Sequence, residues 1–317
     1  ALALTNEDVK KELDGQVVFF AVPAEEYGEI EFKNSLTAQG KIKYGGGKCE
    51  LIRIGAFDDI DLDIVHHTRD KDISVGSHSN NGFVSKVIRY KGLAAHAAGA
   101  PHLGVNALNA ASLGLSALAY QRETFRDDDH VRIHPIITKG GNLVNVVPDE
   151  VVIETLVRAS NKDAIADAAA KTDRAFKAGA IAVGASCEIT TMPGYLPALS
   201  EKADESVLAA AEIASQTSGK DYQIVQEDTH AYSGGSTDVG DVQHLQPVLT
   251  FNTGGKVSGL HSVDFDIVDD ELAYVVTAKI FALSAYRLLR DGAVKAKEIV
   301  ENYQPIFTKE EYIKYMD

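Results

Sequence analysis

Two different patterns of hydrophobic and polar positions follow one another along this chain. The first runs from residue 16 to about 65, where short, continuous apolar runs alternate with polar and glycine-containing segments. Gln16–Val22 (QVVFFAV) predicts a buried strand of the kind found in parallel sheets. A short helix is predicted at Gly47–Ile54, and a second strand at Ile60–Val65, where acidic and apolar residues alternate before a pair of histidines.

A different pattern begins near residue 80, with the strict alternation that is typical of half-buried antiparallel strands. The predicted elements are a strand at Phe83–Tyr90, a helix at Val105–Gln121, strands at Val131–Thr138 and Val144–Val157, a helix at Lys162–Val183 and a strand at Cys187–Met192. Strand, helix, strand, strand, helix, strand is the order of the ferredoxin-like fold. Residues 82–195 are therefore predicted to form an inserted α+β domain.

The first pattern returns after this insertion. The predicted elements are a helix at Lys202–Ser218, a strand at Val248–Phe251, a helix at Asp269–Leu289 and surface helix within 293–317. The sequence thus predicts an α/β fold with a central, mostly parallel sheet and helices on both faces. Its first part is 1–81 and its second part is 196–317. The apolar residues of the first 12 positions predict the tail of a helix without a cap, so we expect an N-terminal portion to be missing.

Charge and composition indicate which molecules the chain could bind and in which compartment it could lie. The net charge of −15 disfavours binding to nucleic acid, because an acidic surface repels phosphate. Cys49 and Cys187 lie far apart, so a disulfide framework is not expected and a reducing compartment is favoured. No continuous apolar run approaches the roughly 18 residues of a membrane span, and no signal peptide is visible. We expect a cytoplasmic protein.

The strongest local signal for chemistry is the pair Glu25 and Glu26, directly after the first predicted strand. Ligands bind beyond the carboxyl ends of strands in open α/β sheets. One carboxylate could hold a metal while the other serves as the general base for a bound water. The alternative for a bare Glu–Glu pair is an exposed acidic turn.

Three histidines complete the candidate metal ligands. His66 and His67 end the second predicted strand, and only one of them can face the sheet edge because neighbours in a strand alternate. His261 lies between a predicted strand and a helix, where a capping loop is the structural alternative. Glu26, one of the two adjacent histidines, and His261 would meet at one edge of the sheet, as a catalytic metal site requires.

Other candidate groups are weaker. His96 follows the first strand of the inserted domain among small residues and could donate a hydrogen bond to an oxyanion, although a loop histidine is the simpler interpretation. Gly45–Lys48 lacks the spacing of a phosphate-binding loop. Ser236 does not lie in a nucleophile elbow, so a serine hydrolase is disfavoured. Arg158 is a candidate for recognising a substrate carboxylate, but a surface strand arginine is at least as well supported.

Six stretches of the sequence, taken in order, resemble the metal-dependent aminoacylase/carboxypeptidase family of clan MH. They are VVFFAVPAEE, GAFDDIDLDIVHH, YKGLAAHAAGAPHLGVNALNA, GGNLVNVVPDEV, STDVGDV and SGLHSVDFDI. The resemblance is to the branch of hippurate hydrolase-like amidohydrolases and aminobenzoyl-glutamate hydrolase. It implies two divalent metal ions, zinc or manganese, and hydrolysis of an N-acyl amino acid or small peptide. It also implies a homodimer formed through the inserted domain.

The resemblance implies a role for each matching residue. Glu25 resembles the general base and Glu26 a metal-bridging glutamate. His67, rather than His66, resembles the ligand that follows GAFDD, and His261 resembles the C-terminal ligand. The family's inserted-domain histidine, which His96 resembles, stabilises the oxyanion in the partner subunit's site. The two remaining matches are to residues near the substrate, namely Asn145 and Asp238.

One departure from the family pattern concerns the upstream ligands. Family members carry a Cys-x-His or His-x-Asp motif before this region, and residues 1–24 contain neither His nor Cys. A binuclear site is therefore not expected to be complete within these residues. The alternatives are a companion fragment that carries the N-terminal part, or a truncated, non-catalytic chain that acts as a dimeric binding module.

Overall fold

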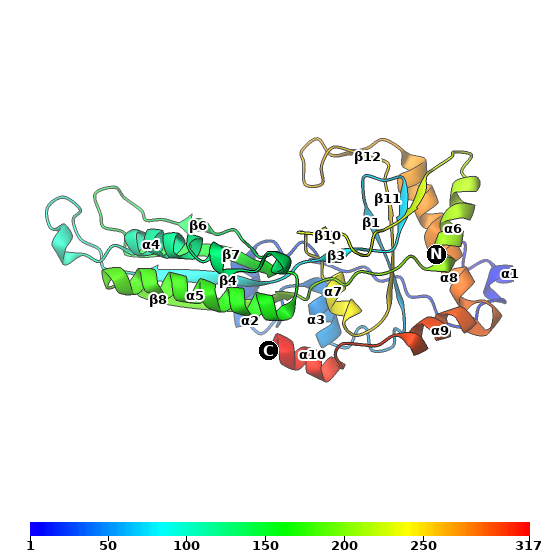
Figure 1. The fold of residues 1–317 in the computed structure, drawn as a ribbon, viewed down its shortest axis with the longest axis horizontal. Coiled ribbons are helices and arrows are strands. Elements are labelled where there is room, and N and C mark those ends of the chain that lie inside the picture. Colours follow the sequence, from blue (N-terminus) through cyan, green and yellow to red (C-terminus); the bar gives the residue numbers. More distant parts are fainter.

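The chain forms a broad body from which a slender arm projects, as Figure 1 shows. The computed structural model describes all of residues 1–317. The chain enters the arm through β4 (Gly82–Lys91) and returns to the body through β8 (Ser186–Tyr195). The body is built from the segments before and after the arm, and both termini lie in it or at its surface (Figure 1).

The body contains a four-stranded sheet with the order β1-β11-β2-β9. Its strands are β1 (Asp63–Thr68), β2 (Ile73–Val75), β9 (Ile224–Gln226) and β11 (Val248–Thr253). β1 pairs with β11 in parallel, β11 pairs with β2 in the antiparallel sense, and β2 pairs with β9 in parallel. The predicted mostly parallel α/β sheet is therefore confirmed.

Helices contribute to two separate cores of the body. One core joins α6 (Glu205–Gln216) and α8 (Thr277–Leu289) to side chains of the sheet such as Ile73 and Phe251. The other joins α3 (Gly47–Arg53), α7 (Val239–Gln243) and α10 (Lys309–Met316) to Val248. Apolar side chains thus hold helices to the sheet on both sides, because burying them removes apolar surface from water.

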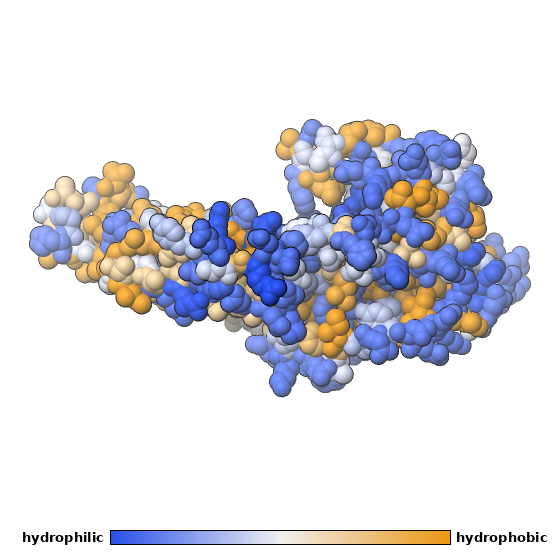
Figure 2. All heavy atoms as spheres, viewed as in Figure 1, coloured by the Kyte–Doolittle hydropathy of each residue, from blue (hydrophilic) through white to orange (hydrophobic).

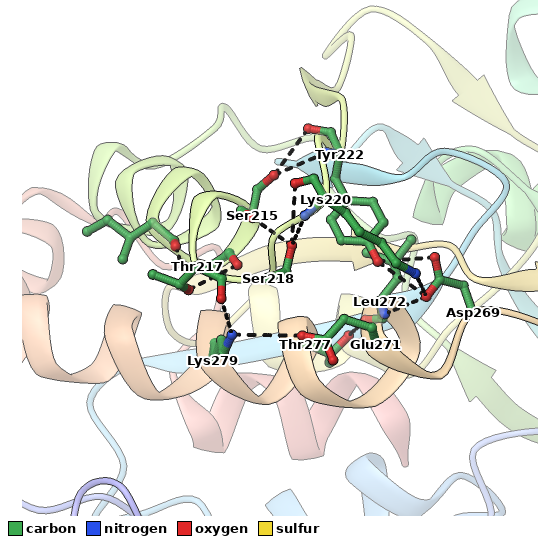
Figure 3. A network of polar contacts seen from close by, with 12 residues as sticks. Ser215, Thr217, Ser218, Lys220, Tyr222, Asp269, Glu271, Leu272, Thr277 and Lys279 are labelled. Carbon is green, nitrogen blue, oxygen red and sulfur yellow. Dashed lines mark hydrogen bonds and ion pairs between the residues drawn. The ribbon is translucent and has the colours of Figure 1, made fainter.

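Polar contacts fix the start of the long helix that ends in α8 (Figure 3). The helix opens with a π-helical segment, Glu271–Val276. Just before it, the Asp269 carboxylate accepts hydrogen bonds from Lys220 Nζ at 2.7 Å and from the Tyr222 hydroxyl at 3.1 Å. Lys279 Nζ donates to the carbonyl of Thr217 at the end of α6, at 3.2 Å. These contacts hold α6 and α8 together where their apolar core ends.

This same helix, Glu271–Leu289, meets the length and apolar composition of a membrane span. The sequence analysis considered only continuous apolar runs, and polar residues interrupt the apolar residues of this helix. In the structure, Leu272, Val276, Ile280 and Leu288 lie in the core of the body. The helix therefore has the buried apolar face of an ordinary core helix.

The arm is an antiparallel sheet covered by two helices. Its further strands are β5 (Arg132–Ile133), β6 (Ile136–Lys139) and β7 (Glu150–Ala159), and the order is β5-β7-β4-β8 with β6 also on β7. α4 (Ala107–Ala119) and α5 (Lys162–Val183) pack on each other and on the sheet. The predicted ferredoxin-like order is present, and Figure 2 shows apolar patches along the arm surface.

A close approach of backbones joins α4 and α5. A Cβ atom added at Gly179 would lie 2.3 Å from the carbonyl oxygen of Ala110 and 2.5 Å from the backbone nitrogen of Gly114. No side chain larger than hydrogen fits there without a backbone shift. The two helices therefore approach more closely than helices that carry large side chains at their contact.

Several short elements complete the fold. They are α1 (Glu7–Lys10), α2 (Ile30–Ala38), β3 (Ser79–Asn80), β10 (Tyr232–Ser233), β12 (Lys256–Val257), β13 (Asp266–Ile267) and α9 (Val294–Asn302). Short 3-10 turns lie at Pro101–Leu103, Arg122–Thr124, Asp127–Asp129 and Asp291–Ala293.

The structure corrects some of the predicted elements. Gln16–Val22 forms no strand but an extended segment, in which Phe19 is 64% exposed. A strand needs a neighbouring backbone for its N–H and C=O groups, and no strand of the structure pairs with this segment. The helix predicted over the first 12 residues is reduced to α1. The strand predicted at Val131–Thr138 is split into β5 and β6 around Pro135, which has no N–H to donate.

Candidate active site

The two adjacent glutamates lie in a turn with an unusual backbone. Ala24, Tyr27 and Glu29 all have positive φ angles, of 59°, 51° and 55°. Non-glycine residues rarely adopt this left-handed conformation, and such residues cluster at functional sites. Glu25 and Glu26 thus follow an unpaired extended segment, and not the buried strand that was predicted.

Two buried tyrosines hold this turn in place. The Tyr27 hydroxyl donates to the carbonyl of Pro193 at 2.8 Å, and the Tyr195 hydroxyl donates to the carbonyl of Glu25. The rings of Tyr27 and Tyr195 pack edge to face with centroids 5.4 Å apart. Since Pro193 and Tyr195 belong to β8, the end of the arm sheet positions the glutamate turn.

The Glu25 side chain is held by the loop before α7. Thr237 Oγ1 donates to Glu25 Oε1 at 2.9 Å. The next residue, Asp238, is fully buried and accepts from the backbone nitrogen of Lys48 at 3.0 Å and from Lys48 Nζ at 2.5 Å. Burial raises the pKa of Asp238, and the Lys48 ammonium acts against that rise. A buried ion pair therefore fixes the residue beside the one that holds Glu25.

Glu26 and His261 lie next to each other across the site. His261 Nε2 is 3.7 Å from Glu26 Oε2, and both side chains are about three-quarters exposed. His261 also has a positive φ, of 65°. The pairing brings together two of the three predicted metal ligands from opposite ends of the sequence.

The third predicted metal ligand, His67, does not lie beside Glu26 and His261. His67 is exposed, and its Nδ1 contacts the carbonyl of the neighbouring Thr68 at 2.7 Å. No cluster of three or more His, Cys, Asp or Glu side chains that could hold a metal ion is present in residues 1–317. A catalytic zinc site needs three protein ligands, so the side chains as placed do not make up a metal centre.

The His66 side chain packs inside the body. Its ring packs against Phe251, and its Nε2 lies 2.7 Å from Thr253 Oγ1. Burial lowers the pKa of His66 to about 4, so it remains neutral at physiological pH. The assignment of His67, rather than His66, as a ligand remains a prediction.

The predicted residues of the inserted domain meet at the far end of the arm. His96 forms a bridge with Val146, and the Ala97 nitrogen donates to the carbonyl of Asn145 at 3.0 Å. His96 Nδ1 accepts from the Gly99 nitrogen at 2.9 Å. The ten residues of β4 span about 30 Å, so this pair lies far from Glu25 of the same chain.

The other predicted substrate residues lie apart from His96 and Asn145. Arg158 pairs with Phe83 at the body end of β7, its guanidinium carbon is 5.8 Å from the Phe83 ring centroid, and burial lowers its pKa. Asp238 is engaged by Lys48. Their assignments as substrate-binding residues remain predictions.

Sequence reasoning missed Thr237 and Lys48. Thr237 precedes the acidic residue that the motif STDVGDV singled out, yet a hydroxyl in a turn has many possible partners. Lys48 was considered only as part of a phosphate-binding loop. Lys48 contacts Asp238, 190 positions away along the chain, and Thr237 contacts Glu25, 212 positions away. Such contacts depend on the tertiary fold, so no local sequence pattern indicates them.

Comparison with known proteins identifies the arm. Residues 78–182 match the M20_dimer family, the peptidase dimerisation domain. The chain is 30% identical over 204 residues to the Xaa-Arg dipeptidase of Homo sapiens, covering 64% of this chain and 45% of that protein. It is 33% identical over 119 residues to one of the subunits of the p-aminobenzoyl-glutamate hydrolase of Escherichia coli, covering 36% of this chain and 24% of that protein. The matched region thus spans less than half the length of each relative.

Solved structures share the fold. An aminobenzoyl-glutamate utilization protein from Klebsiella pneumoniae superposes with a TM-score of 0.56 at 17% identity, covering 77% of this chain and 59% of the other. A dinuclear metal-binding peptidase of the M20 family from Bacillus subtilis gives 0.52 at 22% identity, covering 81% and 69%. These matches show that residues 78–182 form an M20-type peptidase dimerisation domain, and that the chain is similar to part of a dipeptidase and of an aminobenzoyl-glutamate hydrolase subunit.

Proposed function

We propose that this chain belongs to an amide hydrolase that acts on an N-acyl amino acid or a small peptide. The observation that carries the proposal is the glutamate turn, in which Thr237 holds Glu25 while Glu26 lies beside His261. The relatives named as a dipeptidase and as an aminobenzoyl-glutamate hydrolase both cleave such bonds, which supports the same class of reaction here.

Glu25 is the proposed general base. Its Oε1 is fixed by Thr237, which leaves Oε2 free to accept a proton from an attacking water. The same carboxyl group would then return the proton to the departing nitrogen, so that the amide is hydrolysed to an acid and an amine. A positioned acid–base group typically contributes about 10²–10⁴-fold to the rate.

A divalent zinc or manganese ion would supply polarisation of the scissile carbonyl in this class of enzyme. Glu26 and His261 are the donors proposed to hold it, with His67 as the third that the resemblance implies. Because His67 lies away from the other two, these residues do not form a full ligand set by themselves. The proton transfers assigned to Glu25 are therefore the only steps that we derive.

We propose that the active enzyme is a homodimer joined through the arms. His96 and Asn145 lie about 30 Å of strand away from the body of their own chain. In a two-fold dimer, the arm of one subunit could place these residues beside Glu25 of the other. His96 would then donate a hydrogen bond to the developing oxyanion, for which one donor is typically worth about 10²–10³ in kcat.

The test is hydrolysis by the purified chain with added Zn²⁺ or Mn²⁺. Substrates are N-acetyl amino acids, N-benzoyl amino acids and dipeptides, and release of the free amine is measured. We expect turnover that Glu25→Gln lowers at least about 100-fold, while Glu212→Gln, at an exposed glutamate of α6, retains it. A folded dimer that hydrolyses none of these compounds with either metal would support the second candidate, a non-catalytic binding module, which the incomplete ligand set favours.

A further inference from the structure

The only buried residue of helix α2 is a lysine. Lys33 is 9% exposed, and its Nζ has no hydrogen-bond partner. No carboxylate lies within ion-pair distance of it, although its neighbours on α2 find partners readily. Glu31, for example, accepts from Arg89 of the arm at 2.6 Å. An unpaired ammonium is costly to bury, so its position needs a partner.

Lys33 lines a hollow of about 360 Å³ whose wall also contains the carboxylates of Glu26 and Glu29. The Lys33 ammonium lies 4.4 Å from the centroid of the Tyr27 ring, which offsets part of the cost of burial. Burial lowers the pKa of Lys33, and the nearby carboxylate of Asp238 acts against that fall. The hollow therefore joins an unpaired cation to the glutamate turn of the proposed active site.

The rest of the wall determines which ligand would fit. Phe32, Leu36 and Ile42 contribute apolar surface. The hydroxyl groups of Tyr27 and Tyr44 are already engaged, by the Pro193 carbonyl and the Asp317 carboxylate. Lys33 is the one cation of the wall, beside the carboxylates of Glu26 and Glu29, so an anion that fits would carry a single charge on an apolar body. A phosphate group calls for several donors.

We propose that Lys33 binds the carboxylate of the substrate, so that the hollow selects amides that carry a free carboxylate next to an apolar group. This proposal rests on the proposed hydrolase function, because Glu26 in the wall places the hollow beside the reacting bond. It names Lys33 as a substrate-binding residue, which neither the motifs nor the resemblance assigned.

The test compares two probes that differ in one charge. N-benzoylglycine has a free carboxylate, and N-benzoylglycinamide has a neutral amide in its place. Their dissociation constants for the full chain are measured by isothermal titration calorimetry, and chromatography checks that neither probe is consumed. We expect the acid to bind about 10-fold or more tightly than the amide, since a charge-assisted hydrogen bond is worth that much.

Three variants assign the preference to one residue. Lys33→Met should lower affinity for the acid about 10-fold and leave affinity for the amide unchanged, while Lys33→Arg should retain most of the preference. The matched control is Lys41→Met, an exposed lysine just after α2, which should change neither. Circular dichroism and the thermal midpoint check folding, and removing an unpaired buried charge should not lower that midpoint.

Two results would overturn the proposal. One is equal affinity of the wild-type chain for the two probes, which needs no variant. The other is a folded Lys33→Met variant that keeps the full preference for the acid. Binding is measured without turnover, so a chain that prefers the acid through Lys33 but hydrolyses no amide would refute the proposed function and leave only the binding of carboxylates by Lys33.

Discussion

Removing the buried cation at Lys48 should destabilise the body strongly. Lys48 Nζ lies 2.5 Å from a carboxylate oxygen of Asp238, and the two side chains are 13% and 0% exposed. In Lys48→Met, the Asp238 carboxylate would keep its hydrogen bond from the backbone nitrogen of residue 48 but lose its countercharge. Breaking a buried pair from one side typically costs about 3–5 kcal/mol, because an uncompensated charge stays buried.

The assay is the free energy of unfolding by urea at pH 7, followed by circular dichroism. Lys48→Met should lose about 3–5 kcal/mol. The double variant Lys48→Met/Asp238→Asn, which removes the charge as well, should recover most of that loss. Lys309→Met, which removes a more exposed ion pair with Asp58, is the control and should lose at most about 1 kcal/mol. If Lys48→Met lost no more than the control, the ion pair would not be the contact that fixes the loop before α7.

Three further predictions follow from other contacts. Thr237→Val removes the hydroxyl that holds Glu25 and should lower kcat about 10-fold with little change in KM, whereas Thr237→Ser should retain most activity; equal losses in both variants would contradict this role. Gly179→Ala should cost about 1–3 kcal/mol of unfolding free energy by forcing α5 from α4, and Ala182→Ser, exposed on α5, should cost little. Burial raises the pKa of Asp241 to about 8, above an unfolded value of about 3.9, so this group destabilises the fold increasingly as pH rises from 4 to 8. The gain in unfolding free energy from Asp241→Asn should therefore be larger at pH 8 than at pH 5 by about 1 kcal/mol or more, and an equal gain at both would refute the assignment.

Local patterns predicted the order of the elements in the arm, although residues 144–149 of the strand predicted at Val144–Val157 lie outside β7. The alternation in β4 and the helical period of α5 are properties of contiguous residues, and the helix predicted at Lys162–Val183 has those bounds in the structure. Two predicted strands of the body, at Ile60–Val65 and Val248–Phe251, correspond to β1 and β11, which pair in parallel in the structure. These elements bury their own apolar faces within one domain, so sequence period and structure agree.

The segment Gln16–Val22 shows where such reasoning fails. Its apolar run predicts burial, but burial in a sheet also requires a neighbouring strand, and none pairs with it. The candidate site likewise depends on contacts between residues that lie far apart in the sequence. Glu26 and His261 meet although 235 residues separate them along the chain, and the predictions anticipated this meeting from strand ends. The position of His67, and the support of Glu25 by Thr237, depend on tertiary contacts that no spacing specifies.

The most direct test of the proposed hydrolase mixes two inactive variants. Glu25→Gln and His96→Ala are unfolded together, refolded and assayed for amide hydrolysis with Zn²⁺ or Mn²⁺. If Glu25 of one subunit works with His96 of the other, half of the dimers would be mixed and each would hold one intact site. A site shared between subunits should therefore recover about one quarter of wild-type activity. Activity no higher than the average of the two variants, in refolded dimers, would contradict a site shared between the body of one subunit and the arm of its partner.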